Sequence, residues 1–562
     1  MSNNSLSFLN KYRHLISIFI VSFVIRSIES LAESLHIDEA FQIDVYNGDF
    51  LQTINTGVSW GRHPPLDFVV GWLLNLLPID SVYIFRLPNV IFGSLTIVLI
   101  YLIIKEYFNS NIALFVSLGF SVWGPAISYS AYVRPYSSFI FLFILLIYVV
   151  FFHLHQSKSV LLIFVLFFFL PISRGIDGFI ASTLLIFYIF IVSFKLNKFF
   201  RLFLYSISYS ASSLMLYILF TKNDTGVVDP QLNKFDGINL GILDFFNFLI
   251  KFSPIYFLLF LFGLIICLTP VIVLRNTDRD AKFKINHIFV ITLFQILINL
   301  VALRSFTSHG IYNRYFIMFL PLFLSCILLI LVLYFNNNKF IRLICSIFLS
   351  ILFIFSLGSG ISEINNHKNL PFDYLNGRSD LVESTVVYLE GSDNQYLPGW
   401  PNTPGDIDRR HPAWLPYWMN SEQSNKFPDN LVLLARVDTE FGFLVTKRFQ
   451  PERYDYLKNY GRIENISNGI IFYPESNSQY LNALKVIISK RSDPSEIGWL
   501  VTHYLKLKNS VSANQFDTLD YNLVCKVKNI PEIQLGPVFG KWGQTQSWAD
   551  FILNQFSFDF KC

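Results

Sequence analysis

Long apolar runs dominate the first two thirds of this 562-residue chain, from residue 12 to about residue 361. A helix needs about 17 to 25 apolar residues to cross the hydrocarbon core of a bilayer, and many of these runs reach that length. Because backbone N–H and C=O groups must be paired inside lipid, such runs predict α-helices. Only 15% of the residues are charged, against roughly 25% in soluble domains. We therefore predict an α-helical polytopic membrane domain over residues 1–361.

The positions of Lys and Arg orient the predicted spans, because cytoplasmic loops carry an excess of both. The decisive segment is the short apolar run at 66–78, which would invert everything after it if it crossed the membrane. Treated as a helix that lies in the interface, it leaves four later basic clusters on the cytoplasmic side, at Lys158, 195–201, 275–284 and 339–342. This predicts about eleven spans, a cytoplasmic N-terminus and a first external loop at 31–85.

The remainder of the chain, residues 362–562, is more polar and is predicted to form a separate domain. Short β-like runs such as "NLVLLARV" and "GIIFYP" alternate with polar helical stretches such as "PERYDYLKNYG", which indicates an α/β or α+β fold. In the topology above, this domain is extracytoplasmic. Cys525 and Cys562 can pair there if the compartment is oxidising, and the sequence leaves that question open.

Several cations do not follow the topological rule, because they lie at or near the predicted outer ends of spans. They are Arg62, Arg86, Arg134, Arg174, Lys222, Arg304 and Arg314. Such residues either extend to lipid headgroups or bind a shared anion such as a lipid phosphate. We expect Arg86, which precedes Pro88 by two positions, to anchor the interface, whereas several cations at one face favour a shared anion. A nucleic-acid partner is not expected, because the net charge is only +4 and no basic patch is present.

Four short motifs fall on the same predicted outer face: "HIDEAF" (36–41), "GRHPPLDF" (61–68), "SYSAYVRPYSSF" (128–139) and "RYFIMFLP" (314–321). In this order and spacing they resemble membrane glycosyltransferases of the GT-C superfamily. The greatest similarity is to the bacterial polyprenyl-phosphate-sugar-dependent group, which includes protein O-mannosyltransferases and the lipid A aminoarabinose transferase. The resemblance covers roughly residues 10 to 360 and implies a GT-C fold.

The resemblance also implies an activity: transfer of a sugar from a polyprenyl-phosphate donor to a glycolipid, glycan or protein acceptor, by a single inverting displacement. Asp38 matches the catalytic Asp, and Glu39 is its supporting neighbour. Arg134, and Arg314 with Tyr315, match residues that contact the carrier phosphate. His63 matches the histidine of the "HPP" motif. Four further phosphate or substrate contacts are chosen by their predicted face: Arg62, Arg174, Lys222 and Arg304.

Two departures from the family pattern bear on the site. Many relatives carry an acidic residue beside the arginine of the second external loop, where this chain has Tyr132 and Tyr136. No metal or other cofactor is therefore expected, unless Glu39 or Asp177 supplies the missing ligand. Relatives also often carry a Thr-His pair near the outer end of a middle span, where this chain has "ISRGIDGF" (172–179). Arg174 and Asp177 either pair with each other, or Arg174 replaces the histidine as a phosphate contact.

Two other classes of protein compete with the enzyme. A transporter or flippase of lipid-linked sugars would show internal repeats and polar residues in broken mid-membrane helices, and neither is found in the sequence. A catalytically inactive scaffold of the same fold is kept open by the missing acid of the second loop. The expected location is the bacterial inner membrane, with the active site and the C-terminal domain outside the cytoplasm.

Overall fold

The structure is a computed structural model of the whole chain. It describes residues 3–32, 39, 42–43, 45–46, 48–59, 64–78, 82–196, 199–222, 242–243, 245–247, 249–250, 254–268, 276–306, 317–334, 339–366, 385–389, 431–435, 451–466, 469–490, 501, 504–505, 507–508, 522, 533–534 and 545–546. The chain divides into two compact units, one made of residues 1–33 and 45–366 and the other of residues 34–44 and 367–562. Each unit is described by itself.

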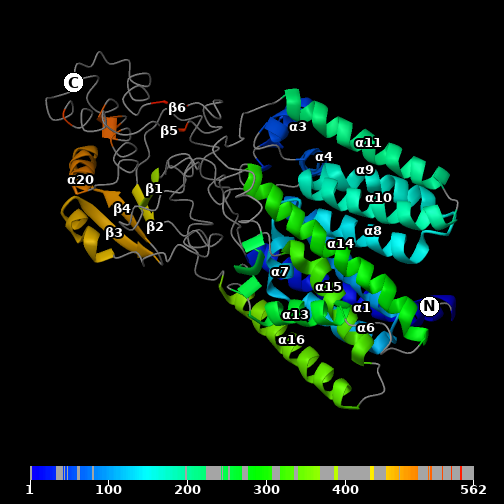
Figure 1. The fold of residues 1–562 in the computed structure, drawn as a ribbon. Coiled ribbons are helices and arrows are strands. Elements are labelled where there is room, and N and C mark those ends of the chain that lie inside the picture. Colours follow the sequence, from blue (N-terminus) through cyan, green and yellow to red (C-terminus); the bar gives the residue numbers. More distant parts are fainter. Residues whose placement is uncertain are drawn as a thin grey trace. The chain divides into compact units, whose positions relative to one another are not determined.

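The first unit is a bundle of long apolar helices (Figure 1). In chain order these are α1 (Asn3–Ala32), α5 (Leu87–Lys105), α6 (Ser110–Ser121), α7 (Gly124–Ala131), α8 (Tyr136–His153), α9 (Ser159–Arg174), α10 (Ile176–Leu196), α11 (Phe199–Lys222), α13 (Pro254–Leu268), α14 (Asn276–Phe306), α15 (Leu320–Tyr334) and α16 (Lys339–Asn366). Helix α5 packs on α1, α6, α7 and α8, and α9 packs on α8, α10 and α11. Helix α15 packs on α13, α14 and α16, while α14 also contacts α10.

The apolar helices can be compared with the predicted spans. Among the described residues, eight helices are long and apolar enough to cross a membrane, the bent pair α6–α7 is a ninth candidate, and α9 and α13 are shorter apolar helices. The described residues thus hold eight or nine helices of spanning length, against about eleven predicted spans. The protein is thus an α-helical integral membrane protein, while the orientation of its helices in the bilayer stays a prediction.

Between α1 and α5 the structure contains two short helices, α3 (Phe50–Ser59) and α4 (Pro65–Asn75), and a 3₁₀ helix at Val82–Arg86. Helix α4 has 11 residues and is about 16 Å long, whereas the hydrocarbon core is about 30 Å thick. It is therefore too short to span, as predicted for the run at 66–78. Helices α3 and α4 pack closely, since a Cβ at Gly57 would lie 2.6 Å from the ring of Phe68.

A bend of 59° separates α6 from α7. Pro125 lies in the first turn of α7, so it cannot donate a backbone hydrogen bond back into α6. The N–H of Gly124 instead donates to Oγ of Ser359 on α16, at 3.0 Å. A Cβ at Gly360 would lie only 2.2 Å from the carbonyl oxygen of Val122. Helix α16 therefore reaches the backbone at the bend and supplies a partner to an N–H group there.

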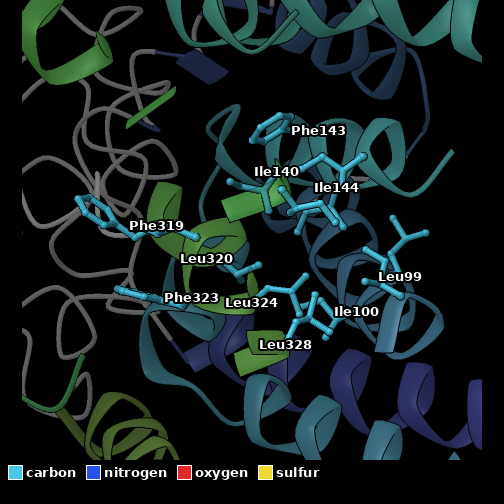
Figure 2. Close-up of a cluster of buried hydrophobic side chains, with 14 of the residues drawn as sticks. Leu99, Ile100, Ile140, Phe143, Ile144, Phe319, Leu320, Phe323, Leu324 and Leu328 are labelled. Carbon is cyan, nitrogen blue, oxygen red and sulfur yellow. The ribbon is translucent and has the colours of Figure 1, made fainter. Parts of the chain in front are cut away.

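The middle of the bundle is an apolar core, which we define by the ten residues labelled in Figure 2: Leu99, Ile100, Ile140, Phe143, Ile144, Phe319, Leu320, Phe323, Leu324 and Leu328. They come from α5, α8, and α15 with the turn before it. The most exposed of them, Leu99, is only 7% exposed. The ring of Phe323 stacks on Tyr256 of α13, with centroids 4.8 Å apart, and lies 5.9 Å from Trp123 at the bend. Outward-facing Phe, Leu and Ile side chains remain exposed on the outer helices, as expected for a surface that faces lipid.

The second unit contains a four-stranded mixed sheet in the order β1-β2-β4-β3. Its strands are β1 (Thr385–Leu389), β2 (Leu431–Ala435), β3 (Gly461–Ile466) and β4 (Gly469–Pro474). Strands β1 and β2 are parallel, and the other pairs are antiparallel, with Arg462 opposite Tyr473. Helix α20 (Asn477–Ser489) packs on β4 through Tyr480 and Phe472. The two quoted β-like runs are therefore strands, and "PERYDYLKNYG" forms a 3₁₀ helix over Pro451–Asn459. Two further two-residue strands, β5 (Ile533–Gln534) and β6 (Thr545–Gln546), pair with each other.

Candidate functional site at one end of the helix bundle

Polar side chains collect where α1 and α9 end and where α5 and α8 begin. We call this region the polar end and define it by the following residues: Ser30, Arg86, Asn89, Tyr129, Tyr132, Arg134, Tyr136, Arg174 and Asp177. All of them belong to the first unit. The contacts below show how the end of one helix is fixed to the beginning of another.

Arg86 joins α1 to α5. It precedes the first residue of α5, and its Nη1 donates to the carbonyl oxygen of Ser30 at 2.7 Å. Ser30 lies in the last turn of α1, where carbonyl groups have no partner within their own helix. The side chain of Arg86 is completely buried. The expectation that Arg86 anchors the lipid interface is therefore wrong, because the guanidinium group caps a neighbouring helix inside the protein.

The loop between α7 and α8 is held by backbone and side-chain hydrogen bonds. Nδ2 of Asn89, on the first turn of α5, donates to the carbonyl oxygen of Tyr132 at 2.7 Å. The same oxygen accepts the N–H of Arg134 at 2.9 Å, and the N–H of Tyr136 donates to the carbonyl oxygen of Arg134 at 2.8 Å. These short-range bonds make a compact turn. Arg134 is only 7% exposed, so the loop presents this cation from a fixed backbone.

Three tyrosine rings surround this loop. The ring centroid of Tyr129 is 5.9 Å from that of Tyr132 and 5.7 Å from that of Tyr136, distances typical of aromatic pairs. All three rings are buried. The positions at which relatives carry an acid are thus occupied by packed aromatic side chains. Among the described residues, no three or more His, Cys, Asp and Glu side chains lie close enough together to hold a metal ion.

Arg174 reaches the same loop from α9. Its Cζ lies 4.2 Å from the ring centroid of Tyr136, and its Nε is 2.7 Å from Oδ2 of Asp177. The arginine and aspartate thus form the ion pair that the sequence had left as one of two possibilities. The stacking also means that the two departures from the family pattern, at Tyr136 and Arg174, contact each other directly.

The "HPP" stretch approaches the same corner. A Cβ at Gly175 would lie 3.4 Å from Cγ of Pro64, and α4 packs on α9. Two of the four sequence motifs therefore reach the "ISRGIDGF" stretch within the first unit: "GRHPPLDF" through Pro64, which lies beside Gly175, and "SYSAYVRPYSSF" through Tyr136, whose ring contacts Arg174. The sequence gives no sign of these contacts, because Pro64 lies 72 positions before Tyr136 and 111 positions before Gly175.

A buried polar stripe on α1 was missed by the sequence interpretation. Ser22, Arg26, Glu29 and Ser30 are at most 6% exposed, and their spacing places them on one helix face. Nη1 of Arg26 donates to Oγ of Ser22 at 2.5 Å and to the carbonyl oxygen of Ser121 at 3.3 Å. Its Nε and Nη2 have no hydrogen-bond partner among the described residues. The signal was available, because ionisable residues inside a predicted span are costly and are usually functional or structural.

The other predicted site residues are distributed as follows. Arg134 and Arg174 both contact Tyr136, Arg134 through its backbone carbonyl and Arg174 through its guanidinium group. Glu39 is fully buried, and it belongs to the segment 34–44 that groups with the second unit. Lys222 is the last residue of α11 and Arg304 lies in the last turn of α14. Asp38, Arg62, His63, Arg314 and Tyr315 lie outside the described residues.

The polar end is suited to bind an anion. Tyr136 contacts two arginines, Arg134 in the loop before α8 through a backbone hydrogen bond and Arg174 at the end of α9 through its ring. Guanidinium groups bind phosphate through paired, charge-assisted N–H donors. Asp177 neutralises part of this charge through Nε of Arg174. With exposures of 12% for Arg174 and 19% for Asp177, the groups are partly shielded from water, which strengthens their electrostatic interactions.

Comparisons with known proteins give distant structural matches only. No protein-family model matches the sequence, and no curated protein does. The structure is similar to that of ArnT from Cupriavidus metallidurans bound to undecaprenyl phosphate, with a TM-score of 0.42, 11% identity, and coverage of 82% of this chain and 98% of that chain. ArnT in the apo state matches with a TM-score of 0.41, 12% identity, and coverage of 83% and 98%. At this similarity the function has to be argued from the residues.

Proposed function

We propose that this protein is an integral-membrane glycosyltransferase. It moves a sugar from a polyprenyl-phosphate donor to a hydroxyl of a glycolipid, glycan or protein, at the extracytoplasmic face of the bacterial inner membrane. The observation that carries the proposal is the contact of Tyr136 with two arginines at one end of an apolar helix bundle. It bonds to Arg134 through the backbone and stacks on Arg174 through its ring, beside Pro64. A lipid phosphate has its charge at the end of an apolar chain, so it suits cations placed at helix ends.

The proposed chemistry is a single displacement at the anomeric carbon. The acceptor oxygen forms a bond to this carbon while the bond between the carbon and the phosphate oxygen breaks, and the electron pair of the broken bond stays on the phosphate. The acceptor proton passes to the carboxylate of Asp38, which acts as general base. Glu39 supports Asp38. One displacement inverts the configuration of the sugar.

The proposed role of the arginines is to stabilise the departing phosphate. Its negative charge grows as the bond breaks, and fixed N–H donors lower the energy of that charge most when water is partly excluded. Arg134 is held in a bonded turn and Arg174 by two partners, so neither has to be ordered during the reaction. Arg314 with Tyr315, Arg62, His63, Lys222 and Arg304 are proposed as further contacts to the donor.

We further propose that no divalent metal takes part. Hard cations such as Mg²⁺ and Ca²⁺ are bound mainly by carboxylate, carbonyl and water oxygens. The second external loop offers Tyr132 and Tyr136 where relatives carry an acid, and both rings are packed among aromatic neighbours. In this proposal the two arginines supply the positive charge.

The test is a transfer assay with purified full-length protein, a radiolabelled polyprenyl-phosphate sugar and a crude envelope fraction as acceptor. Asp38→Asn removes the proposed base. Asp49→Asn is a matched control, because it makes the same change of charge in the same loop. The Asp49 side chain accepts the N–H of Gln52 at 2.8 Å, and Asn is an equally good residue at such a helix start.

We expect wild type and Asp49→Asn to label the acceptor and Asp38→Asn to lose transfer by about a hundredfold or more. Equal labelling by wild type and Asp38→Asn would remove Asp38 as the base. If the wild-type protein transfers no sugar from any polyprenyl-phosphate donor offered, the proposed activity is wrong. A chelator in the same assay should leave the rate unchanged, and a loss that Mg²⁺ or Mn²⁺ restores would contradict the metal-free proposal.

A further inference from the structure

The corner between α9 and α10 is shaped by glycine. Gly175 has a φ of +50°, a conformation that other residues rarely adopt. Its N–H donates to the carbonyl oxygen of Pro171 at 2.8 Å, and its own carbonyl oxygen accepts the N–H of Phe179 at 2.9 Å. A Cβ at Gly178 would lie 2.1 Å from the carbonyl oxygen of Leu170. The corner is thus tightly packed, and it fixes the backbone position of Arg174, the last residue of α9.

Two side chains then hold the guanidinium group of Arg174 in position. Asp177, one turn into the corner, accepts a hydrogen bond from Nε at 2.7 Å. The ring of Tyr136 lies under Cζ at 4.2 Å, well within the distance of about 6 Å over which an aromatic face attracts a cation. The hydrogen bond fixes one edge of the guanidinium plane and the ring fixes one face, so together they define both its position and its tilt.

Tyr136 also connects Arg174 to Arg134. The backbone N–H of Tyr136 donates to the carbonyl oxygen of Arg134 at 2.8 Å, while its ring carries Arg174. A single residue therefore couples the two cations, one through its main chain and one through its side chain. Displacement of the ring is expected to move Arg174 and to leave the hydrogen-bonded turn at Arg134 in place.

We propose that Tyr136 and Asp177 are positioning residues that hold Arg174 as a second contact, next to Arg134, for the phosphate of the lipid carrier. This inference rests on the proposed function and adds the two residues that hold Arg174 in place for phosphate binding. An arginine side chain carries about 2 kcal/mol of rotamer entropy. Because Arg174 is already ordered by its two partners, binding of a phosphate does not have to supply that ordering.

The test measures binding of undecaprenyl phosphate to purified full-length protein in detergent, for example by native mass spectrometry over a concentration series. Tyr136→Phe keeps the ring and Tyr136→Leu removes it, and neither changes the charge. Asp177→Asn keeps a neutral acceptor for Nε, whereas Asp177→Ala removes the acceptor. Each change is also made together with Arg174→Ala. Thermal unfolding of every variant, followed by tryptophan fluorescence, verifies that the bundle is folded.

We expect Tyr136→Phe and Asp177→Asn to bind within about threefold of wild type, and Tyr136→Leu and Asp177→Ala to bind about tenfold more weakly. In the presence of Arg174→Ala, Tyr136→Leu and Asp177→Ala should have no further effect, since there is no guanidinium group left to position. In the transfer assay, the same two variants should raise the KM for the donor by a similar factor and also lower kcat, because Arg174 is proposed both to bind the phosphate and to stabilise it as it departs.

Three results would overturn the inference. Tyr136→Leu could bind as well as wild type, Tyr136→Phe could lose as much as Tyr136→Leu, or the effects could persist in full when Arg174 is already replaced. If Asp177→Ala does not fold, Tyr136→Leu on the other helix decides the question alone. Failure of the proposed function has a different signature, because then the wild-type protein itself binds no undecaprenyl phosphate.

Discussion

The apolar core and the polar end are built from the same helices, but they are held together by different forces. Helix α5 begins with Arg86 before it and Asn89 in its first turn, and then contributes Leu99 and Ile100 to the apolar core. Helix α8 begins with Tyr136 and continues with Ile140, Phe143 and Ile144 (Figure 2). Within about three turns, each helix changes from directed hydrogen bonds to close packing of apolar side chains.

This difference predicts which amino-acid substitutions each region tolerates. In a membrane the helices gain little from hiding apolar groups from water, so the core is held by van der Waals packing of well-fitting shapes. Hydrophobic residues of similar volume should therefore exchange there at small cost. At the polar end each bond has a particular donor and acceptor, as between Asn89 and Tyr132 or Arg174 and Asp177. Loss of one partner leaves the other unsatisfied inside the protein.

The largest expected effect is on catalysis and comes from the polar end. Arg134→Ala should lower the transfer rate by about a hundredfold, because it removes a fixed donor to the departing phosphate, while the thermal unfolding midpoint stays near that of wild type. Arg13→Ala, which changes an exposed arginine near the start of α1, is the control and should retain full activity. Transfer by Arg134→Ala at the wild-type rate would contradict the assignment of catalysis to the polar end.

A smaller effect, on stability, is expected from the core. Phe323→Ala leaves a cavity beside Tyr256 and Trp123, and a cavity the size of a phenyl ring costs about 2 kcal/mol in free energy of unfolding. Phe323→Leu should cost less than half as much. Transfer per folded molecule should remain near the wild-type value in both variants, as measured in the transfer assay after correction for the folded fraction. A loss of activity without a loss of stability would mean that core and site are not separable.

The smallest expected effect is on stability, and it comes from Arg26, a polar residue that lies among the packed helices. Arg26 on α1 is completely buried, and its Nε and Nη2 have no hydrogen-bond partner among the described residues. Arg26→Met has a similar length and no polar N–H groups, so it should raise the free energy of unfolding by about 1 kcal/mol. The thermal unfolding midpoint of the full-length protein measures this. A lower midpoint would show that the hydrogen bonds of Nη1 to Ser22 and Ser121 outweigh the cost of burying Nε and Nη2.

Much of the helical part was predictable, because lipid leaves a chain few choices. The apolar runs became helices, of which eight or nine among the described residues are long and apolar enough to span, and the short run at 66–78 became α4, which is too short to span. The bend between α6 and α7 was not predicted. Pro125 favours a break near that point, but the close approach of Ser359 and Gly360 comes from a helix more than two hundred residues away. Sequence periodicity does not carry contacts of this kind.

The candidate site shows the same division. Arg134 and Arg174 could be selected as cations that break the topological rule, and Arg26 as an ionisable residue inside a predicted span. The burial of Arg86 could not be deduced, since it depends on which helices surround it. Nor could the sequence choose between the two readings of Arg174. The structure shows an ion pair with Asp177 and, in addition, a stacked ring from α8.

The sequence by itself thus determined that this protein is a bundle of membrane helices with out-of-place cations at one predicted face. Backbone hydrogen bonding in lipid and the charge bias of loops act locally, so they can be read along the chain. Only the tertiary structure decided that Tyr136 and Arg174, 38 positions apart, meet at 4.2 Å. That contact depends on the crossing of α8 and α9 and on the positive φ of Gly175. Packing between helices is a property of surfaces that fit, and such a fit cannot be read from either segment alone.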